Sequence, residues 1–179
     1  MTPNEAIAPY RAQFPAKPMK RPADNEDEVR QMQPADGLYE LPAPPAPQPT
    51  FARHGSLPNS DANADEARHL WVIRSADFPV GLEACVWGQG LASKKIKHSN
   101  LTAGAPAHSG GEIWFIGDDR IALNACSGRY GAENEAEFDL IVGALRRSGY
   151  HVASTGFDLD NPTVPNGIFV GDPVWQAPL

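Results

Sequence analysis

Three short polar clusters in the second half of the chain contain residue types that do chemistry in proteins. They are 97–102 (Lys-His-Ser-Asn-Leu-Thr), 110–112 (Gly-Gly-Glu) and 127–133 (Ser-Gly-Arg-Tyr-Gly-Ala-Glu). A histidine can act as a general base near neutral pH, and a carboxylate can orient an acceptor group. An arginine can hold a phosphate through two parallel hydrogen bonds. This combination predicts a site for an anionic substrate.

The third cluster supports the most specific prediction, because it lies directly before a predicted helix. Glu133 would stand at the positive end of the helix dipole, where free backbone N–H groups also suit a phosphate. We expect Ser127 and Arg129 to bind phosphates and Tyr130 to stack on a base, with Glu133 acting in catalysis. The alternative is an ordinary turn, in which Arg129 forms a surface ion pair and Glu133 only caps the helix.

The other two clusters supply the expected base and a second carboxylate. His98 is the candidate general base, with a pKa lowered by the like charge of three neighbouring lysines, and Ser99 beside it is assigned to substrate binding. Glu112 opens a predicted strand after two glycines and is expected to close onto this cluster as a catalytic carboxylate. The alternatives are a solvated loop histidine and an exposed carboxylate at a strand edge.

Metal and disulfide chemistry find little support in the sequence. No pair of histidines has the spacing of metal ligands, and the two cysteines, Cys85 and Cys126, lie 41 positions apart, so no metal bound by protein side chains is predicted. Two cysteines are too few for a disulfide scaffold, and we expect a reduced, buried pair. The chain also contains no Walker loop, Rossmann glycine pattern or nucleophile elbow.

The clusters lie at the ends of predicted strands and of one predicted helix. Apolar and β-branched residues predict strands at 69–74, 81–87, 112–116, 120–126 and 151–157, and the short turn at 117–119 indicates an antiparallel hairpin. Asn134 is a suitable helix N-cap with Glu137 three residues later, and Gly149 is a suitable C-cap. The predicted fold is therefore α+β, with a mostly antiparallel sheet of about five strands and one main helix packed on it.

The first 65 residues have a different composition from the rest of the chain. They contain 12 of the 18 prolines, whereas all four tryptophans lie in residues 66–179. A proline-rich segment with few large apolar residues favours extended, disordered structure. We therefore expect residues 1–65 to form a disordered arm and residues 66–179 a compact α+β domain. The arm is interpreted as a plain tether or, alternatively, as a docking peptide that uses the prolines at 44–47.

Charge and hydrophobicity exclude several classes of protein. The formal net charge is −7, and acidic residues outnumber basic ones in both parts of the chain, so nonspecific nucleic-acid binding is not expected. No apolar run approaches the roughly 18–20 residues that span a bilayer, so no membrane span is expected. The N-terminus lacks the basic start and apolar stretch of a secretory signal. We expect a cytoplasmic protein, or one exported without a signal peptide.

The polar clusters together resemble a pattern of bacterial effector and toxin domains, K-H-S-x-L, then G-E, then S-G-[H/R]-Y, here beginning at Lys97, Gly111 and Ser127. The part from Ser127 to Glu133 is similar to the Ser and His-x-x-x-Glu signature of bacterial effector AMPylases. The resemblance covers residues 94–157. It implies adenylyl transfer from ATP with a divalent metal, and roles for Ser127 and Glu133. Arg129 stands where that family has histidine, and arginine cannot act as a base at physiological pH.

Two functions from different classes follow from these observations. The first is a bacterial effector- or toxin-like enzyme that transfers a nucleotidyl group (AMP) to a protein target, with His98 as the base. The alternative is a non-catalytic protein-binding module, such as an immunity, adaptor or secretion-linked protein. Convergence of His98, Glu112 and Arg129 in one pocket would favour the enzyme, whereas scattering over separate faces would favour the binding module.

Overall fold

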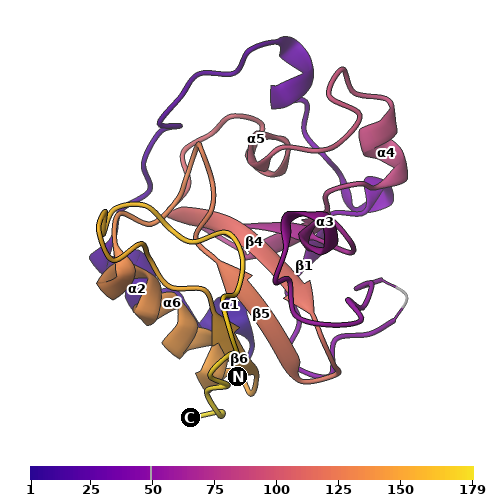
Figure 1. Ribbon diagram of the computed structural model, residues 1–179. Helices are drawn as coiled ribbons and strands as arrows, with labels where there is room; N and C mark the ends of the chain where they lie inside the picture. Colours follow the sequence, from indigo (N-terminus) through magenta and orange to yellow (C-terminus); the bar gives the residue numbers. More distant parts are fainter. Residues whose placement is uncertain (49) are drawn as a thin grey trace.

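A computed structural model describes residues 1–48 and 50–179 of the chain (Figure 1). Its centre is a six-stranded mixed sheet in the order β1-β3-β2-β4-β5-β6. All neighbouring strands are antiparallel except β5 and β6, which are parallel. The strands are β1 (Tyr39–Glu40), β2 (His69–Ile73), β3 (Pro79–Leu82), β4 (Ser109–Phe115), β5 (Arg120–Asn124) and β6 (His151–Ser154).

The helices are short apart from one. They are α1 (Pro3–Ala6), α2 (Ala8–Gln13), α3 (Asp61–Ala64), α4 (Val86–Gln89), α5 (His98–Thr102) and α6 (Glu135–Arg147), with 3-10 helices at η1 (Glu26–Val29) and η2 (Pro34–Asp36). Among the described residues, none of these helices has the length and apolar character needed to cross a membrane. The six-stranded sheet and the helices together confirm the predicted α+β class.

The main helix begins and ends where the sequence predicts. The Asn134 side chain accepts a hydrogen bond from the backbone N–H of Glu137, 3.0 Å away. The Glu137 carboxylate accepts from the backbone N–H of Glu133 (2.8 Å) and from the Tyr10 hydroxyl (2.7 Å), which ties α6 to α2. Gly149 adopts a left-handed φ of 105° after the last turn, as a C-cap glycine does.

Alternation along the strands separates two faces of the sheet. On β4 the side chains of Ile113 and Phe115 join the core beneath α6, and Ile121 and Leu123 of β5 do the same. Glu112 stands on the opposite face, between two smaller apolar clusters. One of those clusters lies around α4 and α5, and the other lies under the C-terminal segment. A polar side chain at this point of the sheet therefore faces the gap between two apolar clusters.

The strand predicted at 81–87 is only partly correct. Strand β3 ends at Leu82, and residues 86–89 form the short helix α4. The Cys85 side chain accepts from the backbone N–H of Gly88 and caps this helix. Val86 is almost fully exposed, so the alternation of apolar residues did not reflect a buried strand face.

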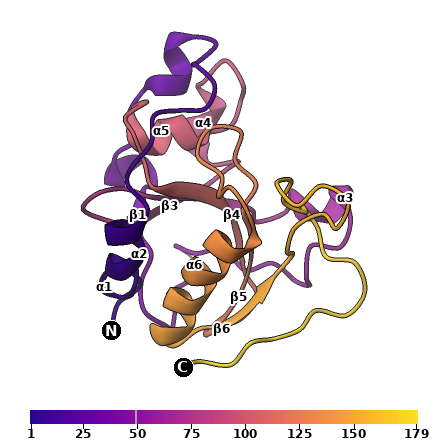
Figure 2. The same ribbon diagram turned by 90° about the vertical axis from the view of Figure 1, so that its left-hand side faces the viewer.

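The prediction of a disordered arm at residues 1–65 is wrong. Several of its large apolar residues are fully or almost fully buried, among them Ile7, Tyr10, Met32, Leu41 and Phe51. Helices α1 and α2 pack beside α6 (Figure 2), and β1 extends the sheet by one strand. Each of these residues is isolated in a polar or proline-rich stretch, so average composition hides the burial. Residues 1–65 contribute to the same main core as residues 66–179.

Residues 15–33, here called the strap, cross the face of the sheet opposite α6. They rise from α2 past α5 to η1 (Figures 1 and 2). Backbone hydrogen bonds between Lys17 and Ala107, 2.9 and 3.0 Å long, anchor the start of the strap. At its far end the Asn100 side chain donates to the carbonyls of Asp27 (2.8 Å) and Arg30 (3.0 Å). The strap is therefore fixed to the domain on both sides of η1.

Candidate functional site

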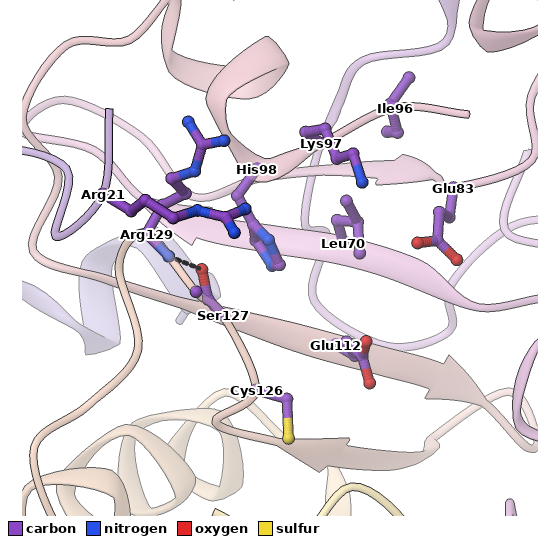
Figure 3. A pocket seen from close by; sticks show the side chains of 11 residues that line it. Arg21, Leu70, Glu83, Ile96, Lys97, His98, Glu112, Cys126, Ser127 and Arg129 are labelled. Atoms are coloured by element: carbon purple, nitrogen blue, oxygen red, sulfur yellow. Dashed lines mark hydrogen bonds between the residues drawn. The ribbon is translucent and has the colours of Figure 1, made fainter. Parts of the chain in front are cut away.

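A pocket of about 280 Å³ opens on the face of the sheet that the strap crosses (Figure 3). Its floor is β2 and β4, one side is the segment leading into α5, and the other side is the loop between β5 and α6. The strap contributes one residue at the rim. The lining residues are Arg21, Leu70, Glu83, Ile96, Lys97, His98, Glu112, Cys126, Ser127, Gly128 and Arg129.

His98 stands at the start of α5 with its imidazole directed into the pocket (Figure 3). Nε2 lies 2.8 Å from the backbone carbonyl of Gly111. A carbonyl only accepts, so Nε2 carries the hydrogen and Nδ1 of the neutral ring keeps its lone pair. Nδ1 has no hydrogen bond within the described part of the chain, and it is not completely covered by protein atoms. Burial lowers the pKa of His98 to about 4, and the charges of Lys97 and Arg68 add to this effect.

The carbonyl that holds His98 is placed by close packing at Gly111. A Cβ atom at this position would collide with the backbone of Asn124 and the ring of Trp71. Only glycine allows β4 to approach its neighbours this closely. The glycine pair before Glu112 therefore brings the strand against β2 and β5, and it fixes the hydrogen-bond acceptor of the histidine.

Glu112 faces the pocket from the middle of β4 rather than from its start. One carboxylate oxygen accepts from the Asn124 side chain (2.8 Å), and the other lies 3.7 Å from the Arg68 guanidinium. Burial raises the pKa of Glu112, and the Asn124 hydrogen bond and the Arg68 charge oppose this. A carboxyl with a raised pKa in a pocket has the properties of a general acid or base.

Arg68 forms an ion-pair cluster beside the pocket. Its guanidinium lies 2.5 Å from the Glu83 carboxylate and 2.9 Å from Asp65, and only 13% of its side chain is exposed. Lys95 lies 3.6 Å from the other oxygen of Glu83. The acidic groups on this side of the pocket are therefore already neutralised in part by two cations.

Ser127 and Cys126 follow β5 and face the same pocket. The Ser127 hydroxyl oxygen accepts from the backbone N–H groups of Arg129 (3.3 Å) and Tyr130 (3.1 Å), which leaves its own hydrogen free to donate to a ligand. Burial raises the pKa of Cys126 to about 12. The Cys126 thiol is therefore protonated at neutral pH and is a poor nucleophile.

Arg129 lines the pocket, but its charge has a partner. Its guanidinium donates to the Glu28 carboxylate of the strap at 2.6 Å, and 5% and 8% of the two side chains are exposed. A second guanidinium nitrogen lies 3.6 Å from the Met19 sulfur. A backbone hydrogen bond from Asp24 lowers the pKa of Glu28, and Arg129 lowers it further, so the Glu28 carboxylate is ionised at neutral pH.

The structure brings four of the seven predicted site residues to this pocket. His98, Glu112, Ser127 and Arg129 line it, although they come from three separate parts of the sequence. This convergence is the outcome that favours an enzyme over a binding module.

The chain matches no known family model, no curated protein and no solved structure.

The other three predicted residues do not line the pocket. Glu133 is exposed and pairs with Lys17 (3.3 Å) and Lys20 (3.2 Å) of the strap, which lower its pKa. Tyr130 is buried, and its hydroxyl bonds to Thr102 and to a backbone carbonyl, both at 2.8 Å. Ser99 is fully buried and its hydroxyl has no described partner. Glu133 and Tyr130 therefore connect the surrounding segments to one another.

Sequence reasoning missed Arg21 and Glu83, and it assigned no role in binding to Lys97, although that pocket residue belongs to the first polar cluster. Arg21 belongs to the segment that was expected to be disordered. Glu83 was expected inside a strand at 81–87, whereas β3 ends one residue before it. Nothing in the local sequence of Arg21 or Glu83 marks either residue as part of a site. Their place in the pocket depends on how the strap and β3 pack.

The pocket residues do not fit a resident metal ion. Within the described residues, no three His, Cys, Asp or Glu side chains gather closely enough to hold one. Glu83 already pairs with Arg68 and Lys95, and Glu112 already accepts from Asn124. No step of the mechanism below is assigned to a metal bound by the protein.

Proposed function

We propose that this chain is an effector- or toxin-like enzyme that transfers a nucleotidyl group from a nucleoside triphosphate to a hydroxyl of a protein. The observation that carries the proposal is the convergence of His98, Glu112 and Ser127 in one pocket with basic side chains at its rim. A neutral imidazole with a lone pair on Nδ1 is suited to accept a proton, and cations at the rim are suited to phosphates.

In the proposed reaction the acceptor hydroxyl attacks the α-phosphorus of the nucleotide. A new oxygen–phosphorus bond forms, the bond to the pyrophosphate breaks, and pyrophosphate leaves with the electron pair of that bond. The hydroxyl proton passes to Nδ1 of His98. The phosphates raise the pKa of His98 from about 4, because a nearby negative charge favours the imidazolium. Ser127 donates its hydroxyl hydrogen to a phosphate oxygen.

An adjoining pocket gives room for the acceptor. It encloses about 350 Å³ and shares Glu112 and Cys126 with the first pocket. Its other side is formed by Asp65, Arg68 and the C-terminal segment at Gly167. Glu112 lies where the two pockets meet, so it is placed to orient an acceptor hydroxyl toward the nucleotide.

Nucleotide binding and turnover test this function. The four nucleoside triphosphates are added singly, with and without Mg²⁺, and thermal stability, pyrophosphate release and protein mass are measured. Binding at 100 times Kd would stabilise the chain by about 2.7 kcal/mol. We expect His98→Ala to abolish pyrophosphate release while the nucleotide-induced shift in Tm remains.

His151→Ala is the matched control, because His151 lies outside the pocket, with Nδ1 3.3 Å from the Asp119 carboxylate. It should leave turnover unchanged. If no nucleotide stabilises the chain and no pyrophosphate is released, the transferase proposal is wrong, and the polar loops belong to a protein-binding module.

A further inference from the structure

Most charged groups around the pocket already have a partner of opposite charge. Arg129 pairs with Glu28, and Glu83 pairs with Arg68 and Lys95. Two cations of the pocket, Arg21 and Lys97, have no such partner. Within residues 1–48 and 50–179, no carboxylate lies within 4 Å of either charged group. The pocket therefore carries positive charge that the protein itself does not neutralise.

The strap fixes the position of Arg21. The residue before it, Lys20, donates its backbone N–H to the Arg129 carbonyl (3.0 Å) and its ammonium group to the Gly131 carbonyl (2.9 Å). Glu28 anchors the following turn to the Arg129 side chain. Arg21 is therefore held between two attachments to the same loop, although its own side chain is exposed.

The two cations stand on either side of the histidine. Figure 3 shows the Arg21 side chain reaching across the pocket toward His98, with Ser127 below it and Lys97 on the other side of the imidazole. A phosphate between the cations would meet a planar guanidinium, an ammonium group and the free hydrogen of the Ser127 hydroxyl. Guanidinium and ammonium groups are the cations that proteins use most to bind phosphate.

We propose that Arg21 and Lys97 form the phosphate-binding site of this pocket, and that the strap is therefore part of the site. This assignment replaces Arg129 as the anion-binding arginine, because the charge of Arg129 is already paired with that of Glu28. The choice of a phosphate rests on the proposed function, but the binding can be measured without any turnover.

The arrangement has a consequence for His98. With no ligand, the charge of Lys97 helps to keep the imidazole neutral. A phosphate bound between the two cations offsets their charge and places a negative group beside the ring. We therefore expect the pKa of His98 to rise when an anion binds. A purely structural role of Arg21 would not produce this change.

Calorimetric titration with inorganic pyrophosphate at low ionic strength tests the site. Arg21→Ala and Lys97→Ala should each weaken binding at least about tenfold, since each removes a charge-assisted hydrogen bond. Arg21→Lys should retain part of the affinity. Arg147→Ala is the matched control: it removes an exposed arginine that does not line the pocket, and it should bind like the wild type.

Nuclear magnetic resonance titration of the histidines is the second measurement. Pyrophosphate should raise the pKa of His98 in the wild type but not in Arg21→Ala, and His98→Gln identifies the signal. The inference is overturned if the wild type binds no pyrophosphate, or if Arg21→Ala binds it as tightly as the wild type. Pyrophosphate binding through Arg21 without nucleotidyl transfer would overturn only the proposed function. Transfer that survives Arg21→Ala unchanged would overturn only this inference.

Discussion

Two of the arginines around the pocket, Arg68 and Arg129, are held in different ways. Arg68 contacts three carboxylates, those of Asp65, Glu83 and Glu112, at 2.5–3.7 Å. Arg129 contacts one carboxylate, that of Glu28, which lies 101 positions earlier in the sequence. The Arg68 cluster joins neighbouring strands of the sheet, whereas the Arg129 pair joins the sheet region to the strap.

The two arginines differ in how many carboxylate partners hold them in place. Loss of any one carboxylate leaves Arg68 with two others, so its position is determined several times over. Arg129 depends on a single partner that belongs to the strap. Removal of a buried ion-pair partner costs more than the pair contributes, because the remaining charge is left without solvent. Substitutions at the two arginines and their partners should therefore have effects of different size.

Arg68→Ala should have the largest effect. It leaves the Glu83 and Glu112 carboxylates facing each other with only Lys95 nearby, and we expect a loss of about 3–5 kcal/mol in the free energy of unfolding at pH 7. Urea denaturation measures this loss. The deficit should be smaller at acidic pH, because burial raises the pKa of Glu112 and a protonated Glu112 no longer needs the cation. An equal deficit at neutral and acidic pH would show that lost packing, not charge, is responsible.

The second prediction concerns His98. Its pKa is about 4 in the folded chain and about 6.5 when unfolded. Between these values the unfolded chain binds a proton that the folded chain does not. The free energy of unfolding is therefore highest above pH 6.5 and falls as the pH drops toward 4, by up to about 3 kcal/mol.

His98→Gln isolates this contribution, because glutamine can still donate to the Gly111 carbonyl but does not titrate. Stability measured from pH 7 to pH 4 should fall less steeply in the variant than in the wild type. His69 remains in both chains, and burial lowers its pKa to about 4 as well, so a residual slope is expected. Identical slopes would contradict the neutral state assigned to His98.

Glu28→Gln tests the single-partner arginine, with an expected loss of about 1–3 kcal/mol. The amide oxygen can still accept from Arg129, so the strap should stay in place while the negative charge is lost. Arg129 would then add its charge to the pocket, and pyrophosphate should bind more tightly than to the wild type. Titration calorimetry and urea denaturation on the same sample measure both effects; weaker binding would show that the strap has detached.

Asp65→Asn should have the smallest effect, below about 0.5 kcal/mol, because the Asp65 side chain is 73% exposed and exposed ion pairs contribute little. Thermal denaturation at matched salt measures it. A loss above 1 kcal/mol would mean that all three carboxylates, and not only the two less exposed ones, are needed to hold Arg68.

Local sequence patterns predicted the elements whose packing follows from their own residues. Helix α6 has an N-cap, an apolar face and a C-cap glycine within 16 residues, from Asn134 to Gly149. Strands β2, β4, β5 and β6 are short apolar runs bounded by turns. The strap, by contrast, holds its place through Met32 and through ion pairs to residues about 100 positions away, which no local pattern records.

The site residues, like the helices and strands, were predictable only where a local sequence pattern marks them. His98, Glu112, Ser127 and Arg129 were found because they lie in compact polar clusters of the sequence, although Glu112 stands in the middle of β4. Arg129 pairs with Glu28 of the strap, a partner that the sequence did not predict. Arg21 could not be found, since an exposed arginine in a proline-rich stretch has no distinguishing feature until the path of the chain is known.

The sequence separation between Glu28 and Arg129 also bears on biosynthesis. At about 5–20 residues per second, roughly 5–20 s of translation separate the two residues, and contacts between distant positions form slowly. The first helices and the strap therefore leave the ribosome long before the surface that buries them exists. During this interval Met19 and Met32 are open to chaperones and proteases. The pocket can form only after the loop that follows β5 has been synthesised, so a nascent chain stalled before that point has no anion site.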